Sequence, residues 1–101
     1  MDRRKDARFR TRFDSLYSLG AREGAGVLGE ISYSSARLDE ASVQPPLGTE
    51  IRLYIFVQPV MPFELMGSVV RHTEDGFAIQ YELSDPGLRN LVDDVAAIVA
   101  T

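Results

Sequence analysis

Residues 50–57 alternate strictly in side-chain character, and this pattern limits the possible folds more than any other feature of the chain. One set of alternate positions is aliphatic and consists of Ile51, Leu53, Ile55 and Val57. Successive side chains of a β-strand point to opposite faces, so the pattern predicts a strand with one face in a core. Residues 77–83 alternate in the same way behind Asp75-Gly76, a dipeptide typical of tight hairpin turns. We therefore expect a chain built mainly from antiparallel strands.

Turn-forming residues divide the rest of the chain into further short strands. These additional predicted strands are residues 13–19, a segment around residues 27–31, residues 36–38 and residues 63–71. The glycine-rich stretch from Gly20 to Gly29 indicates a hairpin with irregular turns. Pro59 and Pro62 confine residues 58–62 to a loop, because proline cannot donate to a strand ladder.

The apolar pattern changes its period near the C-terminus. Apolar residues recur there at the spacing of one helix face, at Leu88, Leu91, Val92, Val95 and Val99. Pro86 suits the first turn of such a helix, which we predict over residues 86–100. Antiparallel strands followed by one amphipathic helix indicate a mainly β (α+β) domain, a barrel or a sandwich. The helix is expected to pack on the outside of the strands or to plug one end.

Charge is distributed unevenly along the chain. Residues 1–12 hold six basic and two acidic side chains, a net charge of +4, whereas residues 13–101 hold five basic and 13 acidic ones, a net charge of −8. We therefore predict a basic arm over residues 1–12 and a single stand-alone domain over residues 13–101. Such an arm suggests an anionic partner, or a solvated tail beside an acidic body.

Several classes of function are disfavoured. The chain has no cysteine and one histidine, so neither a disulfide framework nor a zinc site is expected. No apolar run approaches the ~20 residues that a bilayer span needs, which predicts a cytoplasmic protein without membrane insertion. Residues 24–29 fit G-x-G-x-x-G, but no crossover helix follows them, as a dinucleotide-binding unit requires. His72 has no recognisable nucleophile, so we predict no catalytic residues and no enzyme.

Arginines at the N-terminus are the best candidates for binding. Arg4 and Arg8 stand four residues apart, with Arg3 alongside. Guanidinium groups bind phosphate oxygens through a bidentate fork and also stack on purines. This spacing would let the segment hold a small dianion, although a disordered basic tail would have the same composition.

A second segment, Glu30-Ile31-Ser32-Tyr33-Ser34-Ser35, makes the chain resemble the PilZ family of bacterial cyclic di-GMP receptors. The family signature is R-x-x-x-R, followed some 20–30 residues later by [D/N]-x-S-x-x-G. Residues 4–8 match the first motif, and residues 30–35 match the second in part. Glu30 replaces the usual Asp or Asn, which displaces the carboxylate by ~1.5 Å. Ser35 replaces glycine, which would strain the backbone if φ were positive there.

The resemblance extends along the rest of the chain, through residues 67–71 and residues 76–81. It implies a six-stranded antiparallel β-barrel with a C-terminal helix and a flexible basic N-terminal arm. The residues that it implies as cyclic di-GMP contacts are Arg3, Arg4, Arg8, Glu30, Ser32 and Ser35. The arginines would hold phosphates and stack on guanine, Glu30 would read a guanine edge, and Ser32 would add a hydrogen bond. No cofactor and no metal are implied.

Three functions remain open on the sequence. The first, which we favour, is a cyclic di-GMP receptor that signals through an effector protein, with a homodimer possible. The second is a PilZ-type interaction module that has lost nucleotide binding, for which exposed aromatics such as Tyr54 and Phe56 would supply a docking surface. The third is a small barrel that binds nucleic acid through the arm, which the acidic body disfavours.

Overall fold

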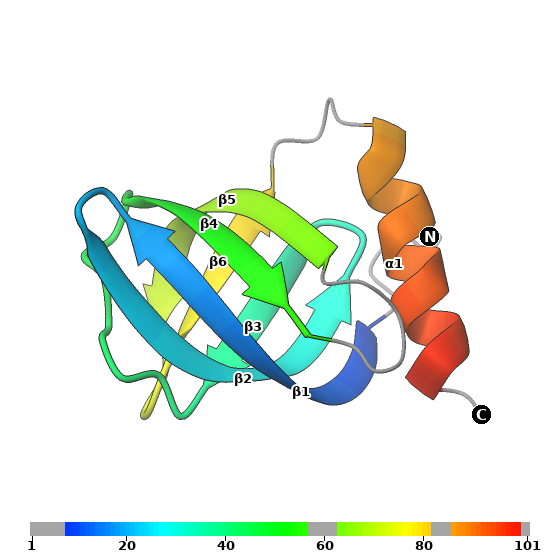
Figure 1. Cartoon of the computed structure of the whole chain (residues 1–101), viewed down its shortest axis with the longest axis horizontal. Coiled ribbons are helices and arrows are strands. Elements are labelled where there is room, and N and C mark those ends of the chain that lie inside the picture. The colour runs from blue at the N-terminus through cyan, green and yellow to red at the C-terminus, as the bar shows by residue number, and fades with distance from the viewer. Residues whose placement is uncertain (1–7, 57–62, 82–85, 100–101) are drawn as a thin grey trace, which may run out of the picture.

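Six strands and one helix make up the structure, a computed structural model that describes residues 8–56, 63–81 and 86–99. The elements are β1 (Arg8–Leu19), β2 (Arg22–Ser32), β3 (Ser35–Asp39), β4 (Glu50–Ile55), β5 (Phe63–His72), β6 (Phe77–Tyr81) and α1 (Pro86–Val99). All neighbouring strands are antiparallel and form a closed barrel in the order β1-β2-β3-β6-β5-β4 (Figure 1). The predicted fold class is therefore confirmed. The barrel closes at β1, because residues 15–18 of this strand pair with β4 as well as with β2.

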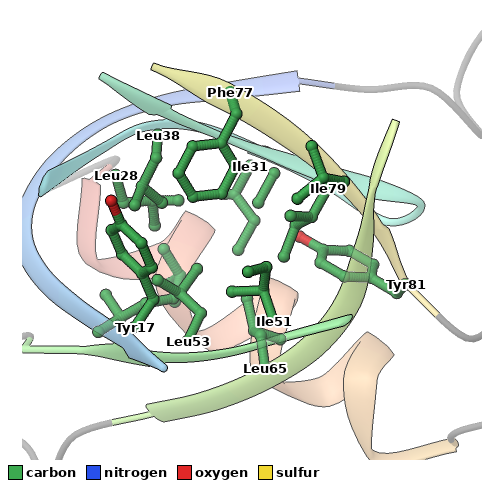
Figure 2. Close-up of a cluster of buried hydrophobic side chains, with 14 of the residues drawn as sticks. Tyr17, Leu28, Ile31, Leu38, Ile51, Leu53, Leu65, Phe77, Ile79 and Tyr81 are labelled. Atoms are coloured by element: carbon green, nitrogen blue, oxygen red, sulfur yellow. The ribbon is translucent and has the colours of Figure 1, made fainter. Parts of the chain in front are cut away.

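Alternate residues of the strands fill the barrel, as the pattern of residues 50–57 predicts. Ile51, Leu53 and Ile55 are buried, and side chains from the other strands meet them in the interior (Figure 2). Near one end, the rings of Tyr17 and Phe77 pack edge to face with centroids 5.1 Å apart. Burial of this single cluster is the main stabilising contribution to the barrel.

The helix α1 lies at one end of the barrel, beside the start of β1 (Figure 1). Its Val92 and Val95 are completely buried and belong to the same cluster as the barrel interior. The amphipathic stripe that predicted this helix is thus the surface that closes the barrel end.

Two predicted boundaries differ from the structure. Strand β1 begins at Arg8 rather than at residue 13, so the last five residues of the expected arm belong to the barrel. The glycine-rich stretch is mostly strand, because β2 covers residues 22–32 and the turn is confined to Gly20 and Ala21. Gly20 has a φ of 68°, which a tight turn favours and which glycine adopts without strain. The predicted loop at residues 58–62 lies outside the described residues.

Candidate ligand-binding cleft

One row of residues crosses the outer surface of five neighbouring strands. The register pairs Arg10 of β1 with Glu30 of β2, and Glu30 with Arg37 of β3. Arg37 pairs in turn with Ala78 of β6, and Ala78 with Arg71 of β5. Directly opposed residues on one face of a sheet are close enough for their side chains to interact. Charged groups from separate parts of the sequence are thereby brought together.

An irregularity in β2 turns Glu30 outward. The pairing of β2 with β3 shifts register between Leu28 and Glu30, which leaves Gly29 as an extra residue. Leu28 and Ile31 are both completely buried although they are three positions apart, which regular alternation would not allow. Bulges of this kind re-aim side chains, and here the bulge places Glu30 on the surface between two core residues.

A second irregularity does the same for Arg71. The pairing of β5 with β6 shifts register between Val69 and Arg71, so Val70 is the extra residue. Val69 points into the core and is 1% exposed, whereas Arg71, two positions later, is exposed. Without the bulge, the two side chains would share the interior face.

These strands enclose a cleft of about 310 Å³. Its charged lining consists of the guanidinium groups of Arg8, Arg37 and Arg71 and the carboxylate of Glu30. Ala78, whose side chain is short, lies in the row between Arg37 and Arg71 and forms part of the lining. Three cations against one anion make the cleft basic, in a chain whose net charge is −4.

Ion pairs hold one side of the cleft in place. Glu30 lies between two arginines, with Oε1 3.6 Å from Nη1 of Arg8 and Oε2 3.6 Å from Nη1 of Arg37. Arg37 also binds Asp39 in a bidentate manner, through Nε at 2.9 Å and Nη2 at 3.1 Å. The hydrogen bond to Asp39 is the main reason why the pKa of Arg37 is raised.

Gly29 makes room for this pair. A Cβ at position 29 would lie 2.0 Å from Oδ2 of Asp39 and 2.9 Å from Nη2 of Arg37. The Arg37–Asp39 pair therefore lies directly over the backbone of the bulge. The glycine is required here by close approach rather than by a turn.

The turn between β2 and β3 positions the serines of the second motif. Ser32 is buried at 3% exposure, and its Oγ accepts hydrogen bonds from the backbone N–H groups of Ser34, at 3.2 Å, and Ser35, at 3.0 Å. The buried Tyr81 donates its hydroxyl to the Ser35 carbonyl at 2.7 Å. Ser32 thus stabilises the turn from its buried side, whereas Ser35 lines the cleft.

The backbone strain considered for Ser35 does not arise. Among the described residues other than glycine, Glu40 is the one with positive φ, at 52°. Ser35 begins β3 in ordinary strand conformation. Serine is therefore accepted at this position without a backbone penalty, and its hydroxyl lies 3.2 Å from that of Ser32.

Tyr33 connects the same turn to two other parts of the molecule. Its hydroxyl hydrogen-bonds to Asp93 of α1, and Arg89 of α1 lies over its ring at 5.1 Å from the centroid. The ring of Phe9, the residue after Arg8, meets it edge on at 6.2 Å. The hydrogen bond to Asp93 is the main cause of a raised Tyr33 pKa.

The structure brings together part of the site predicted from the sequence. Arg8, Glu30 and Ser35 line one cleft, whereas Ser32 is not among its lining residues. Arg3 and Arg4 lie outside the described residues. Within the described ranges, no group of three or more histidine, cysteine, aspartate or glutamate residues could hold a metal ion, and no helix is long and apolar enough to cross a bilayer.

Sequence reasoning missed two charged lining residues, Arg37 and Arg71. Arg37 lies two positions after Ser35, on the same face of a strand, and that spacing was the available signal. Arg71 had no comparable signal, because its outward direction depends on the bulge at Val70.

The protein is thus a small closed antiparallel barrel with a basic cleft across the outer face of its strands. The model of the PilZ domain family matches residues 2–97, and the chain belongs to this family. PilZ domains are receptor and adaptor modules rather than enzymes, and the ligand of the family is cyclic di-GMP.

Solved structures support the fold assignment. The PilZ domain of CeSA from a cellulose-synthesizing bacterium superposes with a TM-score of 0.75 at 10% identity, covering 94% of this chain and 99% of that one. The Bacillus subtilis inhibitor of motility, MotI/DgrA, gives a TM-score of 0.74 at 15% identity over 99% of this chain. This chain spans 52% of the length of the Bacillus protein. No curated protein is similar enough in sequence to count as a match.

Proposed function

We propose that this chain is a receptor that binds cyclic di-GMP in the cleft and signals through a protein partner. The observation that carries the proposal is the convergence of Arg8, Glu30 and Ser35 on one basic cleft. These residues come from three different strands and were selected by two separate sequence motifs. A basic tail without function would not require the second arginine of the R-x-x-x-R motif to lie beside the second motif.

The chemistry of the lining suits a guanine dinucleotide. Each phosphodiester carries one negative charge, which the guanidinium groups bind through charge-assisted hydrogen bonds. Glu30 stays available to a ligand, because its contacts with Arg8 and Arg37 at 3.6 Å are ion pairs longer than hydrogen bonds. A carboxylate has about four lone-pair sites, enough to accept from the ring N–H and the exocyclic amine of guanine as well.

The remaining residues of the predicted site have supporting roles in this proposal. Arg3 and Arg4 would approach the ligand from the N-terminal side, since Arg8 at the start of β1 already lines the cleft. Ser32 would act indirectly, by holding the turn that presents Ser35. Ligand binding would then order the arm over the cleft and change the surface offered to a partner.

One observation favours the second candidate, an interaction module that does not bind nucleotide. Apolar side chains are exposed on the outer face of β1, β4 and β5, where Leu16 is 49% exposed and Met66 51%. Leu16 is paired with Tyr54, and Met66 with the neighbouring Arg52. This face is separate from the cleft, so it would serve a partner with or without nucleotide.

Calorimetric titration with cyclic di-GMP tests the receptor function. We expect binding by the wild-type chain, and a loss of about 10- to 100-fold in affinity for Arg8→Ala, because a hydrogen bond to a charged group contributes about 1.5–3 kcal/mol. Arg4→Ala should weaken binding in the same direction.

Arg22→Ala is the matched control, because Arg22 is exposed at the far end of β2 and does not line the cleft. It should bind like the wild type. Absence of binding by the wild type at high micromolar ligand would end the receptor proposal and leave the interaction module. Binding that survives the substitution of both Arg4 and Arg8 would place the site elsewhere.

A further inference from the structure

Arg71 is the cation of the cleft that the described residues leave without a partner. Arg8 and Arg37 share the carboxylate of Glu30, and Arg37 is additionally held by Asp39. Within the described ranges Arg71 forms neither an ion pair nor a hydrogen bond, although its side chain lines the same cleft. Like charges in one cleft repel each other, so an anion placed among the three guanidinium groups would be attracted by all of them.

Ala78 forms the floor of the cleft beside Arg71, and its short side chain leaves space for such a group. Ala78 lies between Arg37 on β3 and Arg71 on β5, and neighbouring strands are about 4.8 Å apart. The two arginines therefore start about 10 Å apart on either side of a methyl group. Ala78 is 6% exposed although it lies in the outward row, so its neighbours enclose it. A flat or tetrahedral group above Ala78 would be contacted from both sides.

We propose that Arg71 contacts the ligand directly and determines the specificity of the β5 side of the cleft. Its guanidinium group binds a phosphate or stacks on a purine ring over Ala78, opposite the side formed by Arg8 and Glu30. The inference rests on the proposed function and deepens it. It assigns to the site a wall formed by Arg71 and Ala78, which neither the basic arm nor residues 30–35 supply. The ligand that fits this wall is a purine nucleotide carrying phosphodiester groups.

Substitutions at two positions test this wall by calorimetry with cyclic di-GMP. Arg71→Ala should weaken binding by about 10- to 100-fold. Arg71→Lys should restore little, because an ammonium group keeps the charge but lacks the planar fork and the stacking surface. Ala78→Val should also weaken binding, because its added methyl groups occupy the space above the floor while β-branched residues suit a strand.

Thermal unfolding separates a ligand contact from a structural role. Arg71→Ala should melt like the wild type, since its side chain has no described partner to lose. Arg22→Ala is again the control and should change neither affinity nor melting. It lies about 25 Å along β2 from the cleft.

The outcomes distinguish this inference from the proposed function. If the wild type binds and Arg71→Ala binds within twofold of it, the inference is wrong and the receptor function stands. An Arg71→Lys variant equal to the wild type would reduce Arg71 to a charge and refute the direct guanidinium contact.

If the wild type does not bind cyclic di-GMP, the proposed function fails, and inorganic pyrophosphate becomes the probe for the wall. Amide chemical-shift changes at Arg71 and Ala78 that disappear in Arg71→Ala would support an anion site. Their absence would overturn the inference as well.

Discussion

Glu30 shows how much a single side chain in the cleft depends on its neighbours. Its carboxylate lies between Arg8 and Arg37, at 3.6 Å from each, and its side chain is 23% exposed. One oxygen faces each arginine, at the end of a side chain that is one methylene, ~1.5 Å, longer than that of aspartate. Glu30 is therefore both the candidate reader of guanine and the anion that positions two cations.

Replacing Glu30 by glutamine separates these two roles. The Glu30→Gln side chain keeps one accepting oxygen but loses the negative charge, so its hydrogen bonds to the two donors of a guanine edge are weaker, and cyclic di-GMP should bind about tenfold more weakly. Pyrophosphate has no such donors and meets a more positive cleft, so its binding should not weaken. Calorimetry with both ligands measures the difference, with Glu23→Gln as the exposed control on the same strand. Equal losses for both ligands would contradict a guanine-reading role.

At the scale of elements, the turn between β2 and β3 connects the cleft, the start of β1 and the helix α1. Its central residue Tyr33 contacts Phe9 at the start of β1, and Asp93 and Arg89 on α1. The flanking serines belong to the candidate motif, and Ser35 lines the cleft. A change at the cleft therefore has a direct route of contacts to the helix, through side chains that touch one another.

Removal of the Tyr33 ring should loosen α1 selectively. The Tyr33→Ala variant loses the hydrogen bond to Asp93, the ring under Arg89 and the contact with Phe9, while Val92 and Val95 still anchor the helix in the core. Amide hydrogen exchange in α1 should be about tenfold faster, with little change in the strands. Tyr54→Ala is the matched control, a half-buried tyrosine on β4. Uniformly faster exchange in both variants would show that Tyr33 has no special role at the helix.

At the scale of the whole molecule, the stability of the barrel is linked to pH through Tyr81. Tyr81 is 4% exposed, and burial raises the pKa of its hydroxyl, because the ionised form would be poorly solvated in the core. The pKa is higher in the folded than in the unfolded chain. The stabilising contribution is therefore complete below the unfolded value near 10 and is lost as the pH rises through the folded one.

The Tyr81→Phe variant tests this linkage by urea unfolding at neutral and alkaline pH. At neutral pH it should lose about 1 kcal/mol, since the Ser35 carbonyl loses the hydrogen bond from Tyr81 and keeps the one from Ser32. Above about pH 10 its stability should decline less steeply than that of the wild type. The alkaline decline of Tyr33→Phe is measured for comparison, because Tyr33 is a second tyrosine whose pKa is raised in the folded protein. An identical alkaline decline in wild type and Tyr81→Phe would contradict the assignment.

Local patterns were sufficient to predict most of the fold. The alternation around Ile51 and the hairpin signal at Asp75-Gly76 depend only on neighbouring residues, and both correspond to strands of the barrel. The stripe containing Val92 and Val95 predicted α1 to within one residue at its C-terminal end. The prediction of irregular turns was wrong for residues 24–29, which lie in β2. Glycine is selected both where a strand packs closely against its neighbours and where a turn needs backbone freedom, so its presence did not distinguish the two.

The sequence by itself determined the class of fold, the family and the two motifs that carry Arg8, Glu30 and Ser35, because each depends on short-range order along the chain. Tertiary structure alone decided that Arg71 joins them and that Tyr33 reaches α1. The physical reason lies in the bulges at Gly29 and Val70. One extra residue reverses which face every later side chain takes, and only pairing with the neighbouring strand reveals that extra residue.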